Sequence, residues 1–215
     1  MKVDPANKLP KRRGSIFVIS APSGTGKSTL ITRLRVLVRG LAFSVSYTTR
    51  PPRAGEENGR EYFFISPAEF KRRMAQKEFI EWAQVHDHYY GTSWQQLQQA
   101  QEAGQDVLLD IDVQGYKKLR RRLPETVGIF LLPPSFPDLE KRLRHRHKDA
   151  PESIAKRLEA SRKEVAHWKE YDYLIVNDRR SMAAQSLRSV ILAARLRRGC
   201  QERRVAEIYK TFSGG

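Results

Sequence analysis

The sequence is poor in cysteine and has no long apolar run. Its 215 residues include a single cysteine, Cys200, so a framework of internal disulfide bonds is excluded. No stretch stays apolar over the roughly 20 residues that span a bilayer. The N-terminus also lacks the apolar segment of a secretory signal. These absences favour a reducing compartment without a membrane partner, and we expect the protein in the cytoplasm.

Acidic residues are scarce beside basic ones. The chain has 24 aspartates and glutamates against 40 lysines and arginines, a formal net charge of +16. Such an excess favours polyanionic partners, among them nucleotides and nucleic acids. Basic clusters lie at 117–122 (KKLRRR) and 195–204 (RLRRGCQERR), but no base-reading module accompanies them. We therefore expect a solvated basic surface, with nucleic-acid binding that is weak and non-specific at most.

Strand-like and helix-like segments alternate along the chain, which predicts an α/β fold with a mostly parallel sheet flanked by helices. Short apolar runs predict buried strands at 15–20, 106–112 and 127–132, and a last strand before Asp178. A final helix is expected at about 181–198. We divide the chain into a basic, disordered leader (1–13), one domain (14–198) and a polar tail (199–215), with an inserted lobe at about 46–93 and a helical lid at about 136–167.

The stretch SAPSGTGKST, Ser20–Thr29, nearly matches the phosphate-loop pattern G-x-x-x-x-G-K-[ST]. Gly26, Lys27 and Ser28 fit, but Ala21 stands where the pattern has glycine. A strand precedes the stretch and a helix follows, so its backbone N–H groups can surround a phosphate at a helix N-terminus. We expect Lys27 to reach the β- and γ-phosphates of ATP and the Ser28 hydroxyl to bind Mg²⁺. The predicted ATP-binding residues are Ala21, Pro22, Ser23, Gly24, Thr25, Gly26, Lys27, Ser28 and Thr29.

A second segment, TTRPPRAGEENGREYFFI at 48–65, places Arg50 and Arg53 three residues apart beside two prolines. Arginine forks suit bidentate phosphate binding. This segment resembles the signature of guanylate kinases, which convert GMP and ATP to GDP and ADP. The resemblance covers about 14–198 and includes SAPSGTGKS, FIEWAQ, YYGTS, DIDVQG, LLPPS and YDYLIVND. It implies a P-loop kinase core, and it implies that Ala21 is a family variant.

The resemblance also implies roles for single residues. Ser46, Glu81 and Thr92 match positions that read the guanine base. The GMP phosphate is held at the positions of Arg50, Arg53, Tyr62 and Tyr90. Asp110 and Asp112 match an acidic pair near the guanine and the metal, and Arg146 and Arg157 match lid arginines that close on the transferring phosphoryl group. The implied catalytic cations are Lys27, Arg53, Arg146 and Arg157, the implied substrates are ATP with GMP or dGMP, and the implied cofactor is Mg²⁺.

Chemistry supports the guanine assignment independently of the family. Guanine presents two donors on one edge, its N1–H and its 2-amino group, and a carboxylate such as Glu81 can accept both. A site built on such hydrogen bonds can reject a mismatched analogue by factors of about 10⁴ to 10⁵. Phosphoryl transfer itself depends mainly on positioning and on cations, so no catalytic base is required.

Two other functions stay open at this stage. A guanylate-kinase-like binding module would bind phosphorylated peptides without turnover, and a related kinase would use another acceptor, such as a ribose bisphosphate. The intact Lys27 and Ser28 argue against the first, and the set from Glu81 to Thr92 argues against the second. His145 and His147 in the lid are expected to be neutral surface residues. The chain is expected to be a monomer or a homodimer.

Overall fold

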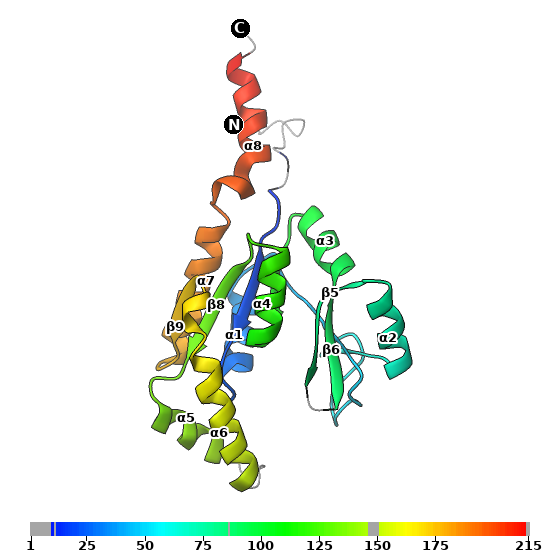
Figure 1. Ribbon diagram of the computed structural model, residues 1–215. Helices are drawn as coiled ribbons and strands as arrows, with labels where there is room; N and C mark the ends of the chain where they lie inside the picture. The colour runs from blue at the N-terminus through cyan, green and yellow to red at the C-terminus, as the bar shows by residue number, and fades with distance from the viewer. Residues whose placement is uncertain (1–9, 11, 86, 146–150, 214–215) are drawn as a thin grey trace.

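The protein is described by a computed structural model in which residues 10, 12–85, 87–145 and 151–213 are placed. Its core is a five-stranded sheet with the order β2-β7-β1-β8-β9, and every neighbouring pair is parallel. This confirms the predicted parallel α/β fold (Figure 1). The strands are β1 (Ile16–Ser20), β2 (Leu41–Phe43), β7 (Asp106–Asp110), β8 (Val127–Leu132) and β9 (Tyr173–Val176).

Alternate residues of the central strands face two separate apolar clusters. Phe17 and Ile19 of β1 pack with Leu34 of α1 (Lys27–Leu37) and Leu187 of α7 (Arg180–Ala194). Val18 faces the opposite side, because successive side chains of a strand point to opposite faces. There it joins side chains of α3 (Trp94–Glu102) and α4 (Val113–Arg122). The helices therefore cover both faces of the sheet.

The predicted inserted lobe is a second, four-stranded sheet with the order β4-β3-β6-β5. Its strands are β3 (Tyr47–Thr48), β4 (Phe63–Phe64), β5 (Phe79–Val85) and β6 (His88–Ser93), and β5 and β6 pair antiparallel. Helix α2 (Pro67–Ala75) is capped by Ser66, whose hydroxyl accepts a hydrogen bond from the Glu69 N–H at 3.1 Å. The lobe stands beside the core, to the right in Figure 1.

The lid segment contains α5 (Phe136–Arg144) and α6 (Pro151–Val165), followed by a short 3₁₀ helix, Trp168–Glu170. Residues 146–150 lie outside the described residues. Both helices follow β8 at the carboxyl edge of the parallel sheet, at the bottom of Figure 1. The lid is thus attached at the edge where ligands bind in open α/β sheets.

The C-terminal region differs from the expectation. Helix α7 ends at Ala194, and a further helix, α8 (Arg198–Ser213), occupies the segment that we expected to be a polar tail. Helix α8 extends away from the core (Figure 1) and exposes Val205, Tyr209 and Phe212. Of the predicted disordered leader, residues 1–9 and 11 lie outside the described residues. No helix in the described part of the chain is long and apolar enough to cross a membrane.

Candidate active site

The phosphate loop connects β1 to α1 at the carboxyl edge of the sheet. Gly24 and Gly26 have φ values of 92° and 95°, which L-residues rarely adopt, so these two positions need glycine. Ala21 has no positive φ, and its side chain packs against the apolar core. The alanine therefore fits the start of the loop without strain. Lys27 opens α1, and its ammonium group forms an ion pair with the Asp110 carboxylate.

The two predicted acids at the end of β7 have different positions. Asp110 is the last residue of the strand and faces Lys27. Asp112 is the N-cap of α4, and its Oδ1 accepts a hydrogen bond from the Gly115 N–H at 2.7 Å. The cap satisfies one of the free N–H groups at the start of that helix. Asp112 thus also has a structural role that the sequence analysis did not predict.

The predicted base-reading residues Glu81 and Thr92 are paired across β5 and β6. Glu81 is only 6% exposed, and its Oε1 accepts a hydrogen bond from the Thr92 hydroxyl at 2.5 Å. Burial raises the pKa of the Glu81 carboxyl, an effect that the Thr92 hydrogen bond opposes. Thr92 therefore orients the carboxylate, which leaves Oε2 for a ligand.

The segment 48–65, which is predicted to bind the GMP phosphate, is organised around Glu56. The Nη2 atom of Arg50 donates to both Glu56 oxygens at 2.9 Å, and the Arg53 backbone N–H donates to the same carboxylate at 2.8 Å. The Arg50 guanidinium lies 5.4 Å from the centre of the Tyr62 ring. The rings of Tyr62 and Tyr90 meet edge to face at 5.8 Å. Arg50, Tyr62 and Tyr90 are thus brought together, whereas the side chain of Arg53 is exposed.

The lid contacts the phosphate loop through α6. Both Nε and Nη2 of Arg157 donate to the Ser23 hydroxyl, at 3.1 and 2.6 Å. Two turns further along α6, Glu164 accepts a hydrogen bond from the Ser23 backbone, and burial raises the pKa of its carboxyl. Arg146 and His147 lie outside the described residues. His145 is exposed, and its Nδ1 lies 2.9 Å from the Lys141 carbonyl.

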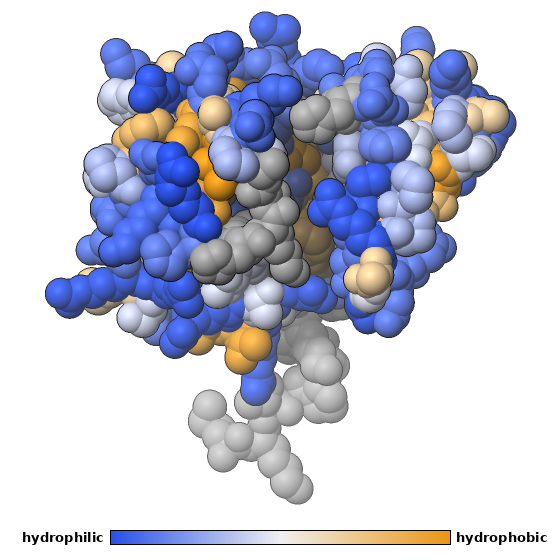
Figure 2. All heavy atoms as spheres, turned by 90° about the horizontal axis from the view of Figure 1, so that it is seen from below, coloured by the Kyte–Doolittle hydropathy of each residue, from blue (hydrophilic) through white to orange (hydrophobic). Residues whose placement is uncertain are grey.

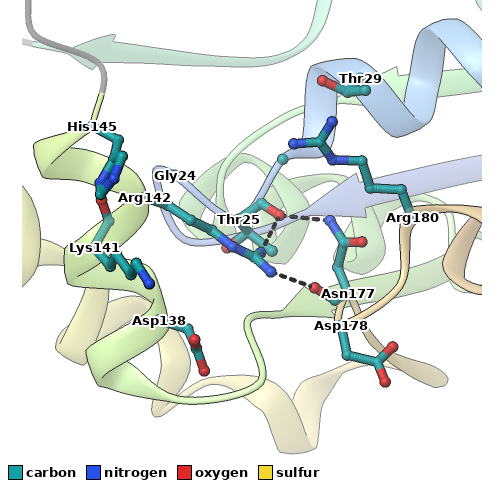
Figure 3. Close-up of a pocket in the computed structure, with 11 residues that line it drawn as sticks. Gly24, Thr25, Thr29, Asp138, Lys141, Arg142, His145, Asn177, Asp178 and Arg180 are labelled. Atoms are coloured by element: carbon teal, nitrogen blue, oxygen red, sulfur yellow. Dashed lines mark hydrogen bonds between the residues drawn. The ribbon is translucent and has the colours of Figure 1, made fainter.

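A cavity of about 510 Å³ opens between the phosphate loop, α5 and the end of β9 (Figure 3). Two residues outside the predicted site set organise it. Asn177 donates to the Thr25 carbonyl at 2.7 Å, and Arg142 bridges the carbonyls of Thr25 and Asn177 at 3.3 and 2.9 Å. Asn177 is buried, and its Oδ1 has no hydrogen-bond partner among the described residues. Arg142 lies in an arginine-rich stretch, and nothing in the sequence distinguishes it from its neighbours.

A second cavity, of about 330 Å³, lies between α1 and the lobe. It brings together four predicted site residues from distant segments, namely Ser28, Ser46, Tyr62 and Asp110. Figure 2 shows the molecule from the edge that carries these cavities, with mostly hydrophilic side chains around a hollow between the core and the lobe. The phosphate loop therefore borders two cavities, one on the side of α5 and one on the side of the lobe.

Comparison with known proteins agrees with this arrangement. The model of the guanylate kinase family matches residues 13–194. The chain belongs to the guanylate kinase family. It is 50% identical to the guanylate kinase of Koribacter versatilis over 188 residues, which cover 86% of this chain and 81% of the relative. It is 48% identical to that of Neisseria meningitidis serogroup A, with 92% and 96% of the two chains covered.

A solved structure shows the same fold. The crystal structure of guanylate kinase from Anaplasma phagocytophilum matches with a TM-score of 0.72 and 32% identity, over 88% of this chain and 90% of that chain. The chain is therefore a nucleotide kinase of the α/β class, and the family name denotes ATP-dependent phosphorylation of GMP.

Proposed function

We propose that this guanylate kinase holds ATP on the α5 side of the phosphate loop and GMP on the lobe side, and transfers the γ-phosphoryl group to the GMP phosphate. The observation that supports this division most directly is the position of Lys27. It lies at the start of α1, next to Asp110, and residues on either side of it line the two cavities. A phosphoryl group that passes between the cavities would pass this ammonium group.

We assign the GMP phosphate to Arg50, Arg53, Tyr62 and Tyr90. Both oxygens of the Glu56 carboxylate now accept from Nη2 of Arg50, and they stand in for those of a phosphate. GMP would displace or share this contact. The side chain of Arg53 is exposed to solvent, and a change of rotamer could bring it toward the phosphate.

We assign the guanine base to Glu81, with Ser46 and Asp112 nearby and Thr92 as the group that orients the carboxylate. Glu81 Oε2 can accept from guanine N1–H and the 2-amino group, a donor pair that adenine lacks. Burial strengthens this discrimination, since an unmatched carboxylate in a buried site has no compensating water.

We assign the triphosphate to the loop from Ala21 to Thr29, with Lys27 and Arg157 as catalytic cations and Arg146 as a further one outside the described residues. Arg157 now donates to Ser23 within the loop, so it is already next to the phosphate position. Arg142 and Asn177 line the cavity that would receive the nucleoside of ATP.

The residues present fit a Mg²⁺ ion of the kind that accompanies ATP. Ser28 and Asp110 line one cavity and offer oxygen ligands, and Mg²⁺ commonly binds through one or two protein oxygens together with phosphates and water. Ser28 would hold the ion, which would neutralise charge on the β- and γ-phosphates.

A panel of acceptors tests the proposal. Purified protein with ATP and Mg²⁺ is given GMP, dGMP, AMP, UMP or ribose 1,5-bisphosphate, and ADP formation is followed. We expect turnover with GMP and dGMP and little with the others. Turnover with the ribose bisphosphate alone would assign the chain to another kinase reaction, and ATP-independent binding without turnover would make it a binding module.

A further inference from the structure

Gly115, the third residue of α4, is a glycine that its backbone does not require. It lies inside a helix and is absent from the positions with positive φ. Alanine is favoured over glycine at such a position, because glycine loses more conformational freedom when a helix forms. The reason for this glycine must therefore be the space around it.

The space at Gly115 is taken by the site's carboxylates. A Cβ atom built on Gly115 would lie 3.1 Å from Glu81 Oε2 and 3.3 Å from Asp112 Oδ1. Both distances are tighter than ordinary van der Waals contacts. Gly115 is buried, so an added methyl group would have no open side to turn to. The glycine thus lies where the core helix α4 meets the lobe strand β5.

Glu81 has little freedom to retreat from such a methyl group. The residue is 6% exposed, and its other oxygen is held by the Thr92 hydroxyl at 2.5 Å. Within the described part of the chain, Oε2 accepts no hydrogen bond, which makes it the oxygen that remains for the base. An added methyl group at Gly115 would therefore displace Oε2 by a few tenths of an ångström.

We infer that Gly115 is a specificity-determining residue of this kinase: its missing side chain keeps Glu81 Oε2 in place to accept from the guanine edge. The inference rests on the proposed role of Glu81. Gly115 itself acts through Glu81 and is a positioning residue. The substrate feature concerned is the 2-amino group, which GMP carries and IMP lacks.

The test is Gly115→Ala, with kcat/KM measured for GMP and for IMP and KM measured for ATP. We expect kcat/KM for GMP to fall about tenfold or more, as for a weakened hydrogen bond to a charged group. The preference for GMP over IMP should shrink, and the KM for ATP should stay unchanged. Gly199→Ala is the matched control, since Gly199 also lies in a helix and a Cβ there meets nothing within 4 Å. It should leave every constant unchanged.

A double-mutant cycle separates this inference from the assignment of Glu81. In a Glu81→Ala background the tightest contact of the added methyl group is removed and no carboxylate at position 81 is left to displace, so Gly115→Ala should change kcat/KM for GMP by less than about twofold. An equal loss in both backgrounds, or wild-type GMP preference in the single variant, would overturn the inference. If Glu81→Ala alone kept wild-type kinetics with GMP, the base-reading role would fail instead.

Folding is checked by thermal unfolding of the four proteins of the cycle, namely the wild type, the two single variants and the double variant. If Gly115→Ala does not fold, the double variant with Glu81→Ala should regain the fold, because the tighter of the two contacts of the methyl group, the one with Glu81 Oε2, is gone. If Gly115→Ala and the double variant both failed to fold, the added methyl group would conflict with a group other than Glu81, and the inference would be overturned.

Discussion

Lys27 is the residue on which turnover should depend most. It begins α1, next to the two glycines whose positive φ values shape the loop, and it now pairs with Asp110. Removal of one preorganised group that stabilises transition-state charge commonly costs about 10² to 10³ in kcat. We expect Lys27→Ala to lower kcat by about 10³-fold and to leave the far-ultraviolet circular dichroism spectrum unchanged.

The control for this variant is Lys71→Ala, which removes an exposed lysine of α2 outside the proposed site. It should keep wild-type turnover. A Lys27→Ala enzyme with kcat within about threefold of wild type would contradict the role given to this residue.

The pH dependence of GMP use should report on Glu81. Burial raises the pKa of this carboxyl above its usual value near 4.5. The ionised form accepts from guanine, so protonation weakens GMP binding, and KM for GMP should rise as pH falls through the raised pKa. The rise in KM is complete at pH values well below the raised pKa and absent at pH values well above it.

The phosphate of GMP is also ionisable, so a matched variant is needed. Glu81→Gln has no ionisable group at this position and reports only the substrate's own titration. We expect the ratio of KM values, Glu81→Gln over wild type, to be large at pH values well above the raised pKa of Glu81 and to approach one as the pH falls below it. A ratio independent of pH would show that ionisation of Glu81 does not govern GMP binding.

At the scale of elements, a buried carboxylate joins segments that are distant in the sequence. Asp106, the first residue of β7, is fully buried and accepts two hydrogen bonds from Arg12, each at 2.7 Å, and one from Arg195 at 2.7 Å. The Ser15 N–H donates to it at 2.9 Å. One side chain thus ties the start of β7 to the residues before β1 and after α7.

Asp106→Ala should lower the free energy of unfolding by about 3 kcal/mol, because it leaves two partly buried arginines without their partner. Asp106 lies at the opposite end of β7 from Asp110, so KM for GMP and ATP should not change at temperatures below the transition. Urea unfolding and steady-state kinetics measure the two effects. Glu125→Ala, which removes a half-exposed carboxylate 3.8 Å from Arg13, should cost less than about 0.5 kcal/mol.

The elements that the sequence predicted well are those specified by adjacent residues. The phosphate loop follows from the Gly, Lys and Ser pattern, and α2 begins where Ser66 can cap it, since both signals act within a few residues. Arg142 and Asp106 could not be predicted in the same way. Their roles depend on carbonyls and arginines that lie 35 to 117 residues away for Arg142, and 89 to 94 residues away for Asp106.

A different limit applies to Glu69, which has the spacing from Ser66 that a capping box requires. The Ser66 half is present, but the Glu69 carboxylate pairs with Arg72 and Arg73 at 2.7 Å in place of the cap backbone. These pairs lower the pKa of Glu69 to about 2. Sequence spacing permits both arrangements, and the structure contains the one in which charge is paired.

At the scale of the whole molecule, much of the basic cluster at 117–122 serves the fold. Lys117 pairs with Glu170 at 2.9 Å, and Arg120 pairs with Asp172 at 2.6 Å. Lys118 donates to the Trp82 carbonyl at 2.8 Å, and Arg122 donates to the Phe79 carbonyl at 3.3 Å. The helix therefore uses its cations to join the core to the lobe and to the last strand. Fewer basic residues are therefore available to bind a nucleic acid.

Helix α8 should be dispensable for catalysis. The family match ends at residue 194, before this helix, and none of its described side chains is buried. We expect a chain that ends at Arg198 to keep kcat/KM for GMP within about twofold of the full chain, as for surface changes. A loss of tenfold or more would show that α8 acts on the site. Size-exclusion chromatography of both chains would show whether the exposed Val205, Tyr209 and Phe212 join two copies.

The remaining charge should act on encounter with nucleotides. A net charge of +16 attracts anions over distances of about 10 Å at 0.1 M salt, and added salt screens this attraction. We expect kcat/KM for GMP to fall steadily as sodium chloride is raised while kcat at saturation stays constant, because salt weakens capture and leaves the closed site unchanged.

Arg203→Gln with Arg204→Gln lowers the net charge by two on α8, which extends away from the site (Figure 1). This double variant should keep the wild-type salt dependence, since only charge near the cavities steers GMP. Arg60 lines the lobe-side cavity, and Arg60→Gln should reduce the salt dependence of kcat/KM for GMP. If the double variant reduced this salt dependence as much as Arg60→Gln, the attraction of GMP would depend on the total charge alone.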